Sequence, residues 1–145
     1  MTTDNLKATG ELQIVLRDKD GNIKQNLHVP NLVVTTGKNA IASRLIGTST
    51  AVMSHMALGT GATATSASDT DLGSQSGSRV ALTASAVSNE ITYSATFPAG
   101  TAGAITEAGV FNASSAGIML SRTVFSVVNK ETTDSLTINW KITIN

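Results

Sequence analysis

Apolar and polar residues alternate without a break in the segment from Ser135 to Ile144. A period of two turns one set of side chains toward a core and the other toward solvent or a partner, as in a half-buried strand. Residues 91–97 alternate in the same way, and residues 12–16 do so less regularly near the other end of the chain. The pattern predicts an all-β protein with strands along its whole length.

Turn-forming residues divide the rest of the chain into further strands. A first hairpin is predicted to join residues 12–16 to residues 23–29, because Asp20-Gly21 between them is a strong signal for a tight turn. We expect Pro30 to end the second strand or to mark a sheet edge, since proline has no N–H to donate to a neighbouring strand. Further strands are predicted at residues 79–87, 90–97, 105–111, 118–128 and in the final segment. This spacing favours an antiparallel sandwich or a jelly-roll-like barrel.

One short helix is expected within this all-β fold. It is predicted over residues 38–46, with Thr35 and Thr36 as its N-terminal cap and Gly47 closing its C-terminal end. Ile41 and Leu45 are four residues apart and would share one face of the helix. We expect this helix to cover one opening of the β core.

A long polar stretch separates the two halves of the predicted strands. Residues 62–77 are almost wholly Ala, Thr, Ser, Asp and Gly, which predicts a long surface loop, with residues 68–72 as a candidate turn of helix. Loops of more than about a dozen residues in a compact domain are usually functional or mobile.

The composition limits the domain organisation and the kinds of partner. The 145 residues are enough for one domain, and we expect residues 1–10 to be a flexible N-terminal segment and residues 11–145 a single β domain. The formal net charge is +0, so no strong field attracts nucleic acid or a membrane surface. With Cys 0, disulfides and thiolate metal sites are excluded. The first residues lack the basic start and apolar run of a signal peptide or membrane span, so we expect synthesis in a cytoplasm.

The surface that this composition predicts is weakly charged. Charged residues make up 14% and aromatic residues 3%, and most polar positions hold Ser, Thr or Asn. A freely soluble monomer usually relies on more surface charge for its colloidal stability. The composition therefore favours a protein held at fixed positions in an assembly, with a soluble domain of neutral surface as the alternative.

Three stretches begin like ligand-binding motifs but lack residues that those motifs need. Residues 59–62 read Gly-Thr-Gly-Ala, but no Lys-Ser or Lys-Thr follows, which disfavours a phosphate-binding loop. Residues 18–22 begin like a calcium loop, yet Val29 stands where a bidentate Glu belongs, so a hairpin turn explains them better. Asp69 and Asp71 are a candidate cation-binding pair without a third acidic residue nearby. We expect no cofactor and no metal site.

Signals for catalysis are equally weak. Neither His28 nor His55 has a carboxylate within two residues, and no Gly-x-Ser-x-Gly elbow presents a serine nucleophile. Spacing along the sequence does not exclude a site assembled from distant residues, but nothing favours one, and we expect the protein not to be an enzyme. Trp140 shares a strand face with Ile138 and Ile142, which favours a core position over a sugar-stacking role.

Glu107 and Arg122 each interrupt an otherwise apolar strand. If the two strands pair across the turn at residues 112–117, with Phe111 opposite Ile118, then Glu107 lies opposite Arg122. We therefore predict a cross-strand ion pair. Its favoured role is to fix the register of the hairpin, because a slip by one residue turns every side chain to the other face of the sheet. The alternative is that the pair forms half of a contact between subunits.

Four runs of residues, taken in order, resemble a group of small β-rich virion structural proteins of tailed bacteriophages. They are NLVVTTGKNAIA at 31–42, MALGTG at 56–61, ITEAGVFN at 105–112 and LSRTVF at 120–125. Each run alone is weakly specific, and the resemblance rests on their succession over nearly the whole chain. In such phages, similar β domains serve as capsid cement (decoration) proteins and as parts of tail fibres and baseplates.

The chain lacks the heptads, collagen-like triplets and long repeats of a fibre shaft, which favours the first of these roles. The resemblance then implies a decoration protein on the outer capsid surface of the virion, assembled in the host cytoplasm, that binds the major capsid protein as a homotrimer. A tail fibre or baseplate component is the alternative. A free-standing carbohydrate-binding module is disfavoured by the 3% aromatic content.

Two segments are the expected contacts with the capsid. One is the polar N-terminal segment, which can become ordered on binding, and the other is the loop at residues 62–77. The residues proposed as contacts in these two segments are Thr2, Thr3, Asp4, Asn5, Leu6, Lys7, Asp69 and Asp71.

Overall fold

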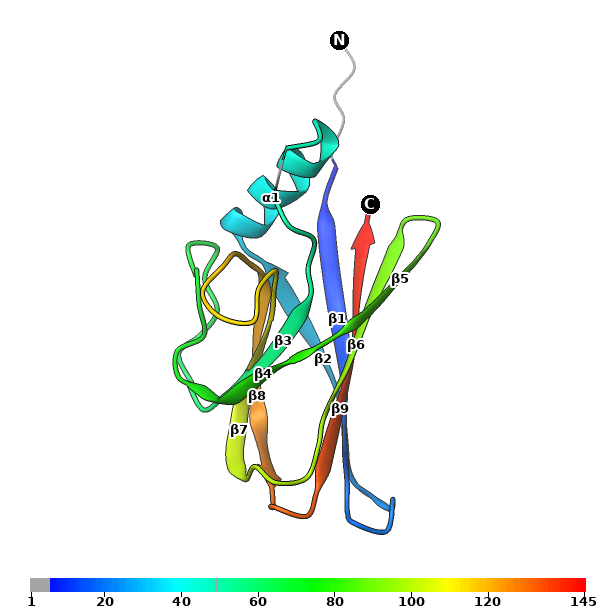
Figure 1. The fold of residues 1–145 in the computed structure, drawn as a ribbon, viewed down its shortest axis with the longest axis vertical. Helices are drawn as coiled ribbons and strands as arrows, with labels where there is room; N and C mark the ends of the chain where they lie inside the picture. The colour runs from blue at the N-terminus through cyan, green and yellow to red at the C-terminus, as the bar shows by residue number, and fades with distance from the viewer. Residues whose placement is uncertain (1–5, 49) are drawn as a thin grey trace.

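The computed structural model describes residues 6–48 and 50–145. Over these residues the chain forms nine strands and one helix (Figure 1). In chain order they are β1 (Ala8–Arg17), β2 (Ile23–Val33), α1 (Thr35–Leu45), β3 (His55–Gly59), β4 (Gln75–Ala81), β5 (Thr83–Val87), β6 (Glu90–Phe97), β7 (Gly103–Phe111), β8 (Met119–Lys130) and β9 (Ser135–Ile144).

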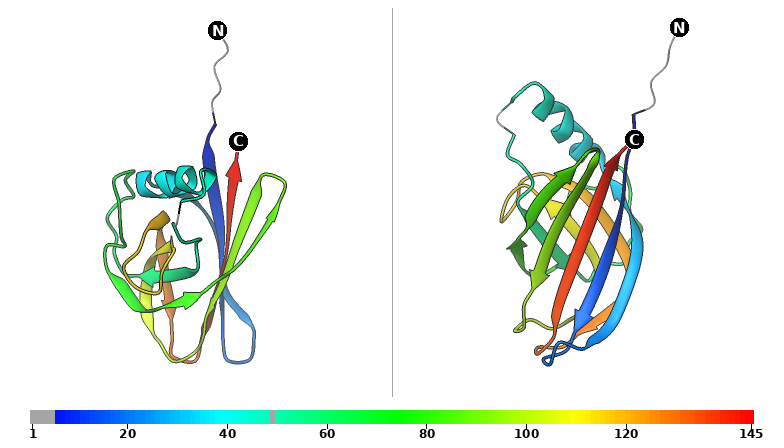
Figure 2. Two further views of the ribbon diagram at one scale, coloured as in Figure 1. Left: turned by 45° about the horizontal axis from the view of Figure 1, so that its top comes forward. Right: turned by 90° about the vertical axis from the view of Figure 1, so that its right-hand side faces the viewer.

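The strands form one antiparallel sheet that curls back on itself. Its order is β4-β3-β7-β8-β2-β1-β9-β6-β5, and every neighbouring pair is antiparallel. The two outermost strands, β4 and β5, are separated in the chain only by Leu82, so the sheet is nearly closed into a barrel (Figures 1 and 2). The predicted fold class, an all-β antiparallel sandwich or barrel with one short helix, is confirmed.

The core lies between the two halves of this sheet. One half consists of β5, β6, β9, β1 and β2, and the other of β4, β3, β7 and β8. β9 shows the predicted alternation, because its even-numbered residues from Leu136 to Ile142 are buried and the residues between them are partly exposed. Trp140 is fully buried in this core, as its strand face predicted.

β2 continues through Pro30 instead of ending there. The carbonyl oxygen of Pro30 accepts a hydrogen bond of 2.7 Å from the Thr123 hydroxyl, so the backbone of Pro30 faces β8. The β2–β8 ladder contains only Leu32 and Val33. Pro30 therefore lies in the part of β2 that β8 does not pair with, so no neighbouring strand requires its N–H. The expected sheet edge is nevertheless wrong, because β2 lies inside the sheet between β8 and β1.

The helix starts earlier than predicted and packs through different residues. α1 begins at Thr35, and no side chain caps it; Thr36 instead donates its hydroxyl hydrogen bond to the Met119 carbonyl at 3.1 Å. Gly37 lies so close to β8 that a Cβ there would collide with the backbone of Leu120. Ile41 and Leu45 both line one groove, as their spacing predicted, but only Ile41 packs against the core, because Leu45 is 82% exposed. Gly47 closes the helix as expected.

Three predicted boundaries change. The predicted strand at 79–87 is two strands, β4 and β5, because Leu82 passes from one half of the barrel to the other. β4 begins at Gln75, so the long loop is residues 60–74, and residues 68–72 form no helix within it. The expected flexible segment at 1–10 is wrong for residues 8–10, which belong to β1 and pair with β9.

Candidate functional site

The structure brings Glu107 and Arg122 together, but in a different register from the one predicted. In the β7–β8 ladder Glu107 lies opposite Val124, and Arg122 lies opposite Gly109. The expected pairing of Phe111 with Ile118 is therefore wrong. Phe111 pairs with Met119, and a register shift between Val110 and Phe111 brings the offset to two residues at Glu107 and Arg122. An offset of two keeps both side chains on the same face and makes them diagonal neighbours within reach of each other.

The ion pair is buried, and two nitrogens of Arg122 donate to the same carboxylate oxygen of Glu107. Arg122 donates from Nε at 3.0 Å and from Nη2 at 2.9 Å to Glu107 Oε2. Glu107 is 0% exposed and Arg122 is 2% exposed. Arg122 also donates to Asp69 Oδ2 at 2.9 Å and to the Thr63 carbonyl at 3.0 Å. The guanidinium group thus joins β7 and β8 to the loop at residues 60–74.

Backbone N–H groups of that loop bind the remaining positions of the Glu107 carboxylate. Gly61 and Ser74 donate to Oε1 at 3.0 and 2.7 Å, and Gly73 donates to Oε2 at 2.9 Å. A Cβ at Gly61 would lie 2.6 Å from Oε1, so only glycine allows this close approach. Gly61, in the Gly-Thr-Gly motif that superficially resembles a phosphate loop, therefore binds the protein's own carboxylate.

These contacts favour the charged form of both partners. Burial acts to raise the pKa of Glu107, but the hydrogen bonds from Ser74, Gly73, Arg122 and Gly61 together outweigh it and hold the pKa below its ordinary value. Burial acts to lower the pKa of Arg122, but its hydrogen bonds to Glu107 and Asp69 outweigh burial and raise the pKa above its ordinary value. Among the described residues, the carboxylate oxygens are fully used by internal donors. The arrangement is that of a structural clamp on the loop.

The loop is closed at its base as well as along its length. Thr60 donates its backbone N–H to the Ser74 carbonyl at 2.8 Å, and the Thr106 hydroxyl donates to the Gly61 carbonyl at 2.8 Å. A loop whose ends meet in this way and whose own groups pack it is a compact surface loop and not an open linker.

The predicted contact residues in the loop have different surroundings. Asp69 turns inward, with its carboxylate 23% exposed and held by Arg122 and by the Ser66 N–H. Asp71 is 65% exposed and lies 3.9 Å from Arg79. Of the predicted N-terminal contacts, Leu6 and Lys7 are exposed. Thr2, Thr3, Asp4 and Asn5 lie outside the described residues.

Arg79 is a buried cation that the sequence did not single out. Its guanidinium carbon lies 3.6 Å from the centroid of the Phe111 ring, and Nη1 donates to the Ala113 and Ala116 carbonyls at 3.0 and 2.8 Å. The side chain thereby fastens the turn between β7 and β8 to β4. Its position among small polar residues in the sequence carries no signal for this role.

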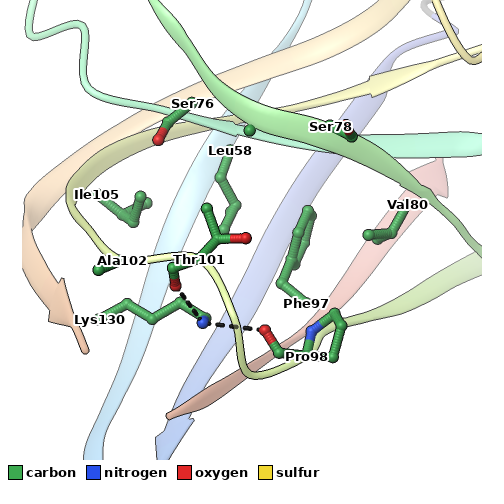
Figure 3. A pocket seen from close by; sticks show the side chains of 11 residues that line it. Leu58, Ser76, Ser78, Val80, Phe97, Pro98, Thr101, Ala102, Ile105 and Lys130 are labelled. Carbon is green, nitrogen blue, oxygen red and sulfur yellow. Dashed lines mark hydrogen bonds between the residues drawn. The ribbon is translucent and has the colours of Figure 1, made fainter. Parts of the chain in front are cut away.

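Lys130 is a second buried cation missed from the sequence. It is 4% exposed, and its Nζ donates to the Thr101 and Pro98 carbonyls at 2.6 and 3.0 Å (Figure 3). Burial lowers its pKa. Its aliphatic stem lines a cavity of about 210 Å³ together with Leu58, Phe97 and other side chains. Both ammonium contacts are to one loop, so Lys130 anchors the connection between β6 and β7.

Metal binding and membrane insertion find no support in the described part of the chain. Within residues 6–48 and 50–145, no three or more His, Asp or Glu side chains are arranged to hold a metal ion. Over the same residues, no helix has the length and apolar character that a membrane span needs. Asp18, in the turn that resembles a calcium loop, accepts hydrogen bonds from the backbone of Asp20 and Asn22 at 2.9 Å, as a hairpin turn requires.

Exposed apolar side chains gather at one end of the barrel, which we call the apolar end. Among the described residues, five of the seven exposed large apolar side chains belong to segments that meet there: Leu6, Leu45, Ile46, Val52 and Val87. Figures 1 and 2 show this end, where α1 lies beside the start of β1 and the end of β9. Between α1 and β1 lies a groove of about 670 Å³, lined mainly by aliphatic side chains.

Comparison with known proteins finds no matching family model, no matching curated protein and no matching solved structure. The described residues form a nearly closed antiparallel β barrel in which a buried ion pair joins a long loop to two strands. At its surface, the apolar end and its groove offer a place for a partner to bind.

Proposed function

We propose that this protein is a decoration protein of a tailed-bacteriophage capsid. It binds the outer surface of the head as a homotrimer and stabilises contacts between subunits of the major capsid protein. The proposal starts from the resemblance of the four sequence runs to small phage virion proteins, and it needs no bond to be made or broken.

The observation that carries the proposal is the apolar end of the barrel. Leu6 and Leu45 are 77% and 82% exposed and lie on either side of one groove. Contiguous apolar patches on a soluble protein usually mark a surface that binds another protein. The nearly closed barrel, with its long loop held by the Glu107–Arg122 cluster, presents this end at one extremity of the fold, which suits attachment to a fixed lattice.

Cement action follows from linkage. A protein that binds only the expanded shell stabilises it by RT ln(1 + [L]/Kd), which is about 4 kcal/mol for each site at a thousandfold excess over Kd. Threefold positions of an icosahedral shell favour a trimer, since homo-oligomers usually adopt closed symmetry.

A tail fibre or baseplate component is the second candidate, because an apolar docking end suits attachment to a tail equally well. The two are distinguished by an electron cryo-microscopy map of the virion that carries this chain. Density for the barrel on the outer face of the head supports the proposal, and density on the tail overturns it in favour of the alternative.

Light scattering on the purified protein tests the oligomeric state separately. We expect a trimer at micromolar concentration. A monomer at every concentration would refute the trimer in solution and leave the location on the head to be decided by the map.

A further inference from the structure

The groove at the apolar end contains an unpaired strand edge. β1 pairs with β9 from Ala8 onward, but its pairing with β2 begins only at Gly10, opposite Asn31. Beyond that point β2 ends at Val33 and the chain turns into α1. The first residues of β1 therefore have a strand neighbour on one side only, within the described part of the chain.

The backbone groups of this edge point into the groove. Lys7 donates its N–H to the Asn145 carbonyl at 2.9 Å and accepts the Asn145 N–H at 2.7 Å, so both of its polar groups face β9. Successive residues of a strand direct these groups to opposite sides, so those of Leu6 and Ala8 face away from β9. They face the space between β1 and α1, where no described strand pairs with them.

The side chains around this edge suit an extended apolar segment. Leu6, Ile41, Leu45 and Ile144 line the groove of about 670 Å³. A strand added beside Ala8 would turn every second side chain toward the aliphatic face of α1. The segment that fits therefore has aliphatic residues at alternate positions.

The positive charges at the groove favour acidic residues at the ends of the bound segment. Lys7 and Lys38 both line it, and neither lies within 4 Å of a carboxylate of the described residues. Two copies of the protein that met through this groove would bring lysines against lysines, which disfavours that contact. Acidic residues at the ends of the bound segment would instead complement the lysines.

We infer that this groove binds an extended segment of a partner protein by β-strand addition to the start of β1. The segment has aliphatic side chains at alternate positions and acidic residues at its ends, and main-chain hydrogen bonds to Leu6 and Ala8 hold it in place. The inference extends the proposed function, because there the capsid subunit would supply the segment. It depends on that function only for the identity of the partner.

A peptide titration tests the groove without knowledge of the partner. The probe is the blocked peptide Glu-Val-Thr-Val-Thr-Val-Glu, added to the full-length ¹⁵N- and methyl-labelled protein, with Lys-Val-Thr-Val-Thr-Val-Lys as the matched control. We expect shifts of the Leu6 and Ala8 amides and of the Ile41 and Leu45 methyl groups. The affinity for the control should be lower, and the difference should shrink at high salt.

Two variants make the test specific to the groove. Leu45→Ser should weaken peptide binding about tenfold, because it removes most of one aliphatic contact. Ala8→Pro removes the N–H that faces the groove and not one used by β9, so it should also weaken binding while the protein stays folded. Ile23→Ser, at an exposed aliphatic residue of the opposite end, is the control and should bind as the unchanged protein does.

Several outcomes would overturn the inference. They are the absence of shifts at millimolar peptide, shifts confined to another surface, or equal binding by Leu45→Ser. Shifts that depend on protein concentration without peptide would assign the groove to a second copy. Stronger binding after deletion of residues 1–5 would assign it to the chain's own first residues. Phage heads that bind the protein and both variants equally would refute the inference alone, whereas heads that bind none would refute the proposed function.

Discussion

Glu107→Gln tests whether the buried cluster holds the long loop on the barrel. The change keeps the side-chain volume and an oxygen that can accept from Gly61 and Ser74. It replaces Oε2, which accepts from Gly73 and from two nitrogens of Arg122, by an amide that donates. Three donors then face a donor, and a buried guanidinium loses its main counter-charge.

The expected loss is about 3 kcal/mol. Removal of one partner of a buried ion pair costs about 3–5 kcal/mol, because it leaves the other charge uncompensated. Asp69 remains 2.9 Å from Arg122 and supports the lower end of this range. For a domain of about 150 residues the loss lowers Tm by about 6–12 °C.

Thermal and urea unfolding of Glu107→Gln, Arg122→Met and the double variant measure the coupling between the two residues. The apolar double Glu107→Leu with Arg122→Met should recover only part of the loss. It leaves the N–H groups of Gly61, Gly73 and Ser74 without their acceptor, and each unpaired buried group costs about 1–3 kcal/mol. Limited proteolysis should also cut the loop at residues 60–74 faster in Glu107→Gln.

The matched control is Glu90→Gln, which removes an exposed ion pair of 3.8 Å with Lys141. An exposed pair contributes under about 1 kcal/mol. If Glu107→Gln cost no more than Glu90→Gln, or if the single effects added within about 0.5 kcal/mol, the clamp reasoning would be refuted.

Three further predictions concern the N-terminal residues, the stability at acidic pH, and the close contact of Gly61 with the Glu107 carboxylate. Deletion of residues 1–5 should leave Tm unchanged, whereas deletion of residues 1–9 should lower Tm because it removes part of β1. Calorimetry measures both values. The same Tm for the two truncated proteins would show that this part of β1 adds no stability. The pKa of Glu107 is lowered on folding, so the ionised carboxylate stabilises the fold above its unfolded pKa of about 4.3, and this stabilisation is lost as the pH falls through the folded pKa. Glu107→Gln should therefore flatten the acidic part of the curve of unfolding free energy against pH. An unchanged curve at acidic pH would contradict the lowered pKa. Gly61→Ala should lower the free energy of unfolding in urea by about 1–3 kcal/mol, because its Cβ would crowd the Glu107 carboxylate. Thr60→Ala, at the neighbouring residue, should change it by no more than about 0.5 kcal/mol. Similar values for both variants would show that the close approach of Gly61 to Glu107 does not matter for stability.

Alternating apolar residues and turn-forming residues together located most of the strands. The predicted strand at 90–97 coincides with β6, and the alternating segment at the end coincides with β9. Both strands have one face in the core and one outside it, so a period of two is visible in the residues themselves. The burial of Trp140 follows from the same periodicity, because its strand face is shared with other core residues.

Register and long-range contacts were decided only by the tertiary structure. The pairing predicted across the turn placed Glu107 opposite Arg122 and so on one face of the sheet. A register that differs by two residues keeps the same faces, which is why the two side chains still meet. The offset includes an irregularity between Val110 and Phe111, after which Arg122 lies opposite Gly109, and the turn residues gave no signal for it. The loop that surrounds Glu107 and the unpaired edge at Ala8 depend on segments far apart in the chain. Local sequence patterns therefore indicate which residues are buried. The partners of each buried charge and strand edge depend instead on how distant segments pack together in the folded barrel.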